Sequence, residues 1–129
     1  MNCPFCELPK ARIVSENELA VWIYDGYPIS AGHSLIIPKR HVGSFFNTTP
    51  QEKFAMLALL DEAKTTLEAK FDPDAYNIGI NDGAASGQTV PHLHMHLIPR
   101  YQGDVPDPRG GVRWVIQEKA DYWSEPKHD

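Results

Sequence analysis

The chain has 129 residues, of which 42% are hydrophobic and 22% charged, a composition typical of a globular protein that can form one core without disulfide bonds. No apolar run approaches the roughly 20 residues needed to cross a bilayer, and a net charge of -5 argues against broad nucleic-acid binding. We expect one domain over residues 1–129, located in the cytoplasm because the first residues carry no secretion signal.

The first part of the chain has the pattern of short β-strands. Residues 11–16 and 18–24 are rich in β-branched and aromatic residues and predict two antiparallel strands joined by a tight turn. Residues 33–38 predict a third strand, which Pro38 ends.

A long helix is expected next. Thr49 followed by Pro50 and Glu52 has the pattern of a capped helix N-terminus, and residues 72–74 close the helix. Its predicted apolar stripe consists of Phe54, Leu57, Leu60, Ala63 and Leu67.

The second half returns to strands. Residues 75–81 predict a fourth strand, residues 82–87 a flexible turn, and residues 92–98 a further strand that should pair antiparallel with the fourth. Residues 112–117 predict a last strand, and residues 118–129 form a charged and aromatic tail. An antiparallel sheet with one long helix is an α+β arrangement.

Three histidines at alternate positions, His92, His94 and His96, are the most informative feature of the chain. In a strand they would lie on one face, with neighbouring rings roughly 7 Å apart. Four interpretations compete. Structural histidines would leave several buried nitrogens unpaired, at about 1–3 kcal/mol each, and a metal site lacks nearby carboxylates in the sequence. Covalent catalysis at a phosphorus centre, with imidazole as the nucleophile, is favoured over a binding protein without turnover.

Cys3 and Cys6 form a pair with two-residue spacing. In a reducing compartment such a pair more often binds a metal or cycles between redox states than forms a stable disulfide. Zinc would need two further ligands, because the chain has only two cysteines. Two free thiols and a redox pair are the alternatives.

The stretch from Gln88 to Ile98 resembles the signature of the histidine triad (HIT) family, in which three histidines alternate with apolar residues. The similarity extends to Asp25, to residues 33–41 and to residues 109–114, and covers most of residues 3–117. It implies a HIT-like α+β fold, an antiparallel five-stranded sheet with one long and one short helix. It also implies a homodimer with a ten-stranded sheet, and chemistry at the α-phosphorus of adenine nucleotides.

The resemblance also implies roles for individual residues. The middle histidine, His94, would be the nucleophile that forms a covalent nucleotidyl-histidine, with its second ring nitrogen donating to a backbone carbonyl or a similar acceptor. His96 and His33 would lie beside the phosphate. The substrate contacts implied are Asp25 at the ribose hydroxyls, Asn81 near ribose and phosphate, and Gln88 and Thr89 as neutral donors to phosphate oxygens. For Asp25 and Asn81, ordinary turn chemistry is the alternative.

In some branches of this family a histidine after the third strand and the first triad histidine complete a zinc site, and these positions correspond to His41 and His92. The resemblance thus implies structural zinc held by Cys3, Cys6, His41 and His92, with residues 1–10 as a zinc-binding segment. The function predicted is hydrolysis or nucleotidyl transfer on dinucleoside polyphosphates such as Ap4A, or on adenosine phosphoramidates. A nucleotide-binding or scaffolding module with little turnover, and a metal-dependent enzyme that uses the histidine row as ligands, are the alternatives.

Overall fold

The computed structural model describes residues 3–124, so residues 1–2 of the predicted N-terminal segment and 125–129 of the predicted tail lie outside the described residues. The strands are β1 (Ile13–Glu16), β2 (Ala20–Tyr24), β3 (Ser34–Pro38), β4 (Ala75–Ile80) and β5 (Met95–Arg100). The helices are α1 (Pro50–Phe71) and α2 (Gln117–Ala120). The predicted α+β fold, with a five-stranded antiparallel sheet and one long helix, is confirmed.

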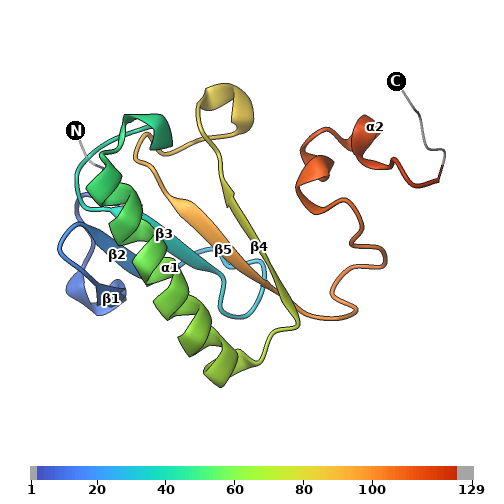
Figure 1. Cartoon of the computed structure of the whole chain (residues 1–129), viewed down its shortest axis with the longest axis horizontal. Helices are drawn as coiled ribbons and strands as arrows, with labels where there is room; N and C mark the ends of the chain where they lie inside the picture. Colours follow the sequence, from blue (N-terminus) through green and yellow to red (C-terminus); the bar gives the residue numbers. More distant parts are fainter. Residues whose placement is uncertain (1–2, 125–129) are drawn as a thin grey trace.

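The sheet has the strand order β1-β2-β3-β5-β4, with every neighbouring pair antiparallel (Figure 1). This order places β5 between β3 and β4, so that His96 pairs with Leu35 on one side and with Gly79 on the other. The pairing of β4 with β5 is the one the sequence predicts. Side chains from three strands therefore meet around His96.

The histidine row begins before the strand does. His92 and His94 precede Met95, the first residue of β5, so only His96 of the three is a strand residue. Alternation of the two faces still holds along the whole segment, because the intervening side chains of Leu93, Met95 and Leu97 are buried in the core on the α1 side. His94 and His96 consequently face away from α1.

Helix α1 covers one face of the sheet and starts with the predicted capping box. The Thr49 hydroxyl accepts from the Glu52 N–H, and the Glu52 carboxylate accepts from the Thr49 N–H. Two further hydrogen bonds from the Arg40 guanidinium lower the pKa of the buried Glu52 carboxyl to about 2. These contacts fix the rotation of the helix at its first turn.

The apolar stripe predicted for α1 is partly wrong. Ala63 and Leu67 are buried as predicted, but Phe54 is 74% exposed and Leu57 51% exposed. The side chains that face the sheet are Glu52, Met56, Leu59, Ala63 and Leu67. Apolar residues form two stripes of helical spacing on this helix. The stripe that faces the sheet is the one on the same side of the helix as the anchored Glu52.

The strand predicted over residues 112–117 is also wrong, because this segment is helical. Gly110 and Gly111 both have positive φ and turn the chain out of an extended path. A 3-10 helix, η4 (Gly111–Val115), and α2 follow, and Arg113 ties them together by donating to the carbonyls of Ala120 and Lys119. The segment extends beyond the β4 side of the sheet (Figure 1), and sheet order in the described residues ends at β4.

A second, smaller apolar cluster lies on the sheet face opposite α1. It consists of Val21, Ile23, Leu35 and Ile37, with Phe5, Leu8 and Ile13 packed against it. The N-terminal segment thus covers one end of this face and leaves the β4–β5 end open. None of the described helices is both long enough and apolar enough to cross a membrane.

Candidate functional site

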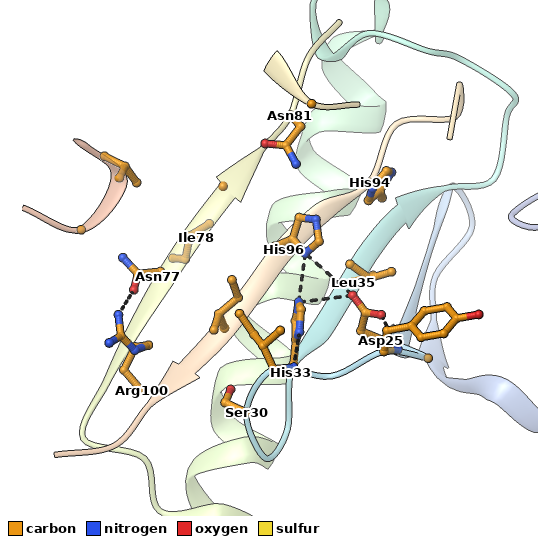
Figure 2. A pocket seen from close by; sticks show the side chains of 18 of the residues that line it. Asp25, Ser30, His33, Leu35, Asn77, Ile78, Asn81, His94, His96 and Arg100 are labelled. Carbon is orange, nitrogen blue, oxygen red and sulfur yellow. Dashed lines mark hydrogen bonds and ion pairs between the residues drawn. The ribbon is translucent and has the colours of Figure 1, made fainter. Parts of the chain in front are cut away.

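A groove of about 1190 Å³ lies on the open face of the sheet (Figure 2). This volume is larger than the few hundred cubic ångströms of many small-ligand sites and suits an extended ligand. Polar side chains along it include Asp25, His33, Asn77, Asn81, Thr89, His94, His96 and Arg100.

His94 stands in the groove with one ring nitrogen engaged. Its Nδ1 lies 2.9 Å from the carbonyl oxygen of His92. A carbonyl only accepts hydrogen bonds, so in the neutral ring Nδ1 carries the proton and Nε2 keeps its lone pair. A half-buried imidazole in this tautomer can offer Nε2 as a nucleophile or as a base.

His33 and His96 form a hydrogen-bonded pair beside it. The backbone N–H of Ile29 donates to Nδ1 of His33 at 3.2 Å, which assigns the His33 proton to Nε2. That N–H donates to Nδ1 of His96 at 2.9 Å. Nδ1 of His96 is therefore an acceptor, and the neutral His96 ring carries its proton on Nε2. These two hydrogen bonds form a relay from the backbone N–H of Ile29 through the His33 ring to the His96 ring.

Asp25 adds a carboxylate to this pair. Its Oδ2 lies 3.4 Å from Nε2 of His33 and 3.9 Å from Nδ1 of His96, as Figure 2 shows. Its Oδ1 accepts from the Tyr27 N–H at 2.8 Å, so the carboxylate also caps the turn after β2. No carboxylate lies near the histidine row along the chain, and Asp25 reaches it only through the fold.

Burial favours the neutral form of both rings of the pair. It lowers the pKa of His33, and the charge of Asp25 offsets part of this effect. It also lowers the pKa of His96, and the rings of His94 and His33 lower it further, while Asp25 raises it. A neutral His96 is what the relay requires, since its Nδ1 must accept.

The Asp25, His33 and His96 ligand atoms lie within 4.8 Å of one another, which is close enough for a metal ion. The hydrogen bond from Ile29 argues against such use, because a metal at Nε2 of His33 would place the ring proton on Nδ1, facing the Ile29 N–H. Two N–H groups cannot form a hydrogen bond with each other. The geometry favours a chain of hydrogen bonds that fixes the tautomers of His33 and His96.

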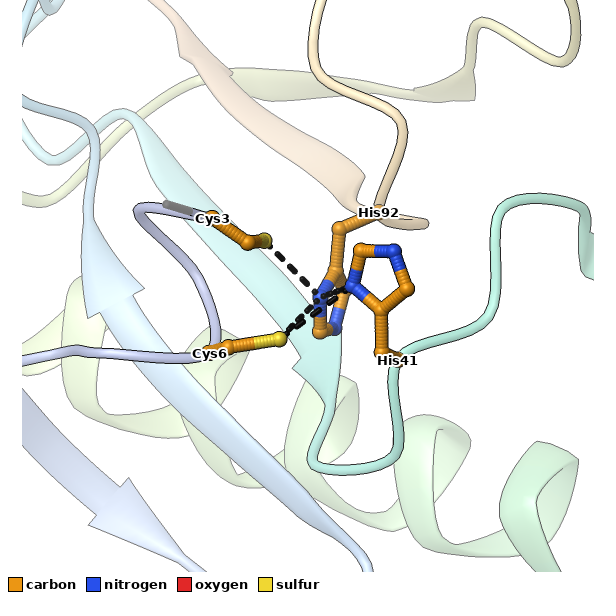
Figure 3. Close-up of side chains that lie close together, drawn as sticks. All are labelled: Cys3, Cys6, His41 and His92. Atoms are coloured by element: carbon orange, nitrogen blue, oxygen red, sulfur yellow. Dashed lines mark hydrogen bonds between the residues drawn. The ribbon is translucent and has the colours of Figure 1, made fainter. Parts of the chain in front are cut away.

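A second cluster, formed by Cys3, Cys6, His41 and His92, is suited to metal binding (Figure 3). Nε2 of the fully buried His92 donates to the Pro38 carbonyl at 2.8 Å, so its Nδ1 keeps a lone pair. This Nδ1 lies 3.2 Å from Nδ1 of His41 and 3.4 and 3.5 Å from the two sulfur atoms.

The donor set of this cluster fits zinc. Two sulfur and two imidazole ligand atoms lie within 4.8 Å of one another, a Cys2His2 set that zinc binds in a closed tetrahedral arrangement. The hydrogen bond from Nε2 of His92 to the Pro38 carbonyl is also of the kind that orients a ligating histidine. The four residues singled out from the sequence thus meet at one point.

The loop after β4 brings Asn81 and Thr89 to the groove, where both are exposed. Figure 2 shows Asn81 at the end of β4, near His96 and His94. Amide and hydroxyl groups at these places can donate to the oxygens of a bound phosphate.

Gln88 does not line the groove, and its side chain differs from the expectation of a phosphate donor. Its Nε2 donates to the carbonyls of Gly43 and Val90 at 2.9 and 3.1 Å, and its Oε1 accepts from the Gly83 N–H at 2.8 Å. Gly83 and Gly87 have φ values of 94° and 99°, which the tight loop requires. The Gln88 amide therefore forms hydrogen bonds that close this loop, and both its oxygen and its nitrogen are engaged.

Some groove residues were missed from the sequence. Phe5 reaches the His94 ring, and its place between two cysteines was the only signal. Val112 and Trp114 line the groove together with Ile98. Their position depends on the path of the C-terminal segment, which the strand prediction described wrongly.

Comparison with known proteins places these features in one family. Residues 7–103 match the family described as HIT domain. The chain is 35% identical over 105 residues to the uncharacterized 16.1 kDa HIT-like protein of Mycoplasma pneumoniae, covering 78% of this chain and 73% of that protein. It is 43% identical over 77 residues to the asymmetrical bis(5'-nucleosyl)-tetraphosphatase of Schizosaccharomyces pombe, covering 60% of this chain and 42% of that protein.

A solved structure resembles the chain over most of its length. It is the crystal structure of a Zn-bound histidine triad family protein from Mycobacterium smegmatis, with a TM-score of 0.71 and 35% identity. The match covers 89% of this chain and 91% of that one.

Proposed function

The chain belongs to the HIT domain family, and from this membership we propose that it cleaves adenine nucleotides at the α-phosphorus through a covalent nucleotidyl-histidine on His94. The substrates proposed are dinucleoside polyphosphates such as Ap4A, or adenosine phosphoramidates. A similar protein of fission yeast is named as a bis(5'-nucleosyl)-tetraphosphatase, which supports the first class. The observation that carries the proposal is the His94 tautomer, with Nδ1–H bonded to the His92 carbonyl and Nε2 unprotonated in the groove.

With a dinucleoside polyphosphate, the first step forms a bond from His94 Nε2 to phosphorus and breaks the bond from phosphorus to the departing oxygen. The attacking ring becomes cationic, and the His92 carbonyl that accepts its Nδ1–H stabilises that charge. A polyphosphate leaves as an anion, to which His96 Nε2–H donates a hydrogen bond. In the second step water attacks phosphorus, the electron pair of the N–P bond returns to Nε2, and one proton is released to solvent.

Substrate binding is assigned to the groups around these rings. Asp25 would accept hydrogen bonds from the ribose hydroxyls with a carboxylate oxygen, while Asn81 and Thr89 would donate to phosphate oxygens. These two donors are neutral, which suits a site that must release a charged mononucleotide.

We propose zinc at the Cys3, Cys6, His41 and His92 cluster, with a structural role. Zinc would fix the N-terminal segment against the start of the histidine row, and a set of two cysteine thiolates and two imidazoles fits its tetrahedral preference. A reducing compartment such as the cytoplasm would keep both cysteines available as thiolates.

We also propose a homodimer. β4 is an edge strand in the described sheet, and pairing with the β4 of a second copy would give the expected ten strands. Light scattering at micromolar concentration should give twice the mass of one chain, and a monomer would contradict this assembly.

The test of the activity is release of AMP from Ap4A and from adenosine phosphoramidate by the wild-type chain and by His94→Ala. We expect turnover by the wild type and loss of turnover in the variant, with AMP binding retained as the control for an intact groove. A wild-type chain that binds AMP but cleaves neither substrate class would favour a binding module and refute the proposed activity.

A further inference from the structure

The Phe5 side chain connects the Cys3/Cys6 loop with the His94 ring. Its ring centroid lies 5.0 Å from that of His94 at an interplanar angle of 59°, and 6.0 Å from that of His92 at 88°. The opposite side of Phe5 packs on the small apolar cluster of the sheet. A backbone hydrogen bond of 3.1 Å from Cys6 to Cys3 closes the loop around it. Phe5 is therefore held between the sheet and His94.

His92 provides a second connection between the same two places. Its Nδ1 faces the cysteine sulfur atoms, its Nε2 donates to the Pro38 carbonyl, and its own carbonyl accepts the Nδ1–H of His94. The His92 ring is fully buried, and close packing transmits displacements, so movement of this ring would shift the backbone carbonyl that sets the His94 tautomer.

Building on the chemistry proposed above for His94, we propose that Phe5 is a positioning residue that holds the His94 ring in its attacking orientation. Occupancy of the cysteine and histidine cluster by zinc controls the rate of attack through Phe5 and the His92 carbonyl. The aromatic contact restricts rotation of the ring, and the carbonyl fixes which nitrogen is free. Misplacement of a reacting group by about 1 Å can cost on the order of 100-fold in rate. Loss of the Phe5 ring should therefore slow the attack by about 10- to 100-fold.

The matched control for Phe5 is Leu8, which packs on the same apolar cluster but does not line the groove. The rate of a single turnover is measured with the zinc-loaded full chain at saturating Ap4A, so that weaker binding does not enter the rate. We expect Phe5→Ala to be slow, Phe5→Tyr to recover most of the rate, and Leu8→Ala to lose stability but keep the rate. A Phe5→Ala protein as fast as the wild type, or an equal loss in Leu8→Ala, would overturn the positioning role.

A second readout needs no substrate. Nitrogen-15 NMR of the histidine rings reports whether His94 holds a single Nδ1–H tautomer, before and after a chelator removes zinc and after zinc is returned. We expect the single tautomer to be lost and then restored, while circular dichroism shows the fold retained. Unchanged His94 signals would overturn the coupling. If chelation unfolds the chain, the spectra of folded Cys6→Ser, which lacks one of the four proposed zinc ligands, replace those of the chelated sample. If neither substrate class is cleaved, only the proposed activity fails.

Discussion

Removing the His33 ring should shift His96 to the tautomer that carries its proton on Nδ1. In His33→Ala, Nδ1 of His96 loses the donor that now lies 2.9 Å away, and an acceptor, Asp25 Oδ2, lies 3.9 Å away. A shift of about 1 Å would bring these two atoms within hydrogen-bond distance. A hydrogen bond to a charged group contributes about 1.5–3 kcal/mol, which at about 1.4 kcal/mol per tenfold then favours the Nδ1–H tautomer by about 10- to 100-fold. The fraction of His96 rings that can donate from Nε2 falls by the same factor, and the single-turnover rate should fall with it.

The assay is rapid-quench release of AMP at saturating substrate, at a temperature where circular dichroism shows each variant folded. The control is His33→Gln, whose amide N–H can still donate to Nδ1 of His96, so we expect it to recover most of the rate. His33 is 4% exposed, and melting temperatures therefore accompany both variants to register the cavity left by alanine. A folded His33→Ala that reacts as fast as the wild type would refute the relay, and so would a His33→Gln no faster than His33→Ala.

Three further predictions concern the stability of the fold and its binding of zinc. Because burial holds the pKa values of His33 and His96 below the ordinary 6.5, the unfolded chain binds protons that the folded chain does not. The free energy of unfolding should therefore fall as the pH drops below about 6.5 through the folded-state pKa values. Urea titrations at about pH 7.5 and about pH 5.5 check this, and equal free energies would count against it. Glu52→Gln, which weakens the bonds from Arg40 and the helix cap, should cost about 1–2 kcal/mol in thermal unfolding, whereas an unchanged melting temperature would show that the cap is dispensable. Cys6→Ser should lower the zinc content measured by mass spectrometry, and full retention of zinc would remove this residue from the ligand set.

Sequence patterns predicted the elements that depend mainly on residues close together along the chain. The capping box of α1, the four strands before the histidine row and the alternation of Leu93, Met95 and Leu97 depend on spacing along the chain, and the structure confirms them. The rotation of α1 was beyond such reasoning, since both of its apolar stripes have helical spacing. The anchoring of Glu52 by Arg40 decides between them, and that contact depends on the tertiary structure.

The site shows the same division between local and tertiary information. Alternating histidines indicate a functional row, yet the sequence could not show that Asp25 reaches His33 and His96, because strand order brings these residues together. The engagement of Gln88 in its own loop was equally hidden, as it depends on the Gly43 carbonyl 45 residues earlier. Sequence patterns do not predict a side-chain role that depends on a contact with a residue far away along the chain.

The central claim is that Nε2 of His94 attacks phosphorus. The most direct measurement is to mix the protein with Ap4A labelled at the α-phosphate, quench within one turnover, and locate the label by peptide mass and its ring nitrogen by phosphorus and nitrogen-15 NMR. We predict AMP bound to Nε2 of His94 in the wild type and no adduct in His94→Ala. Label on another residue or on Nδ1, or wild-type turnover by His94→Ala, would contradict the account.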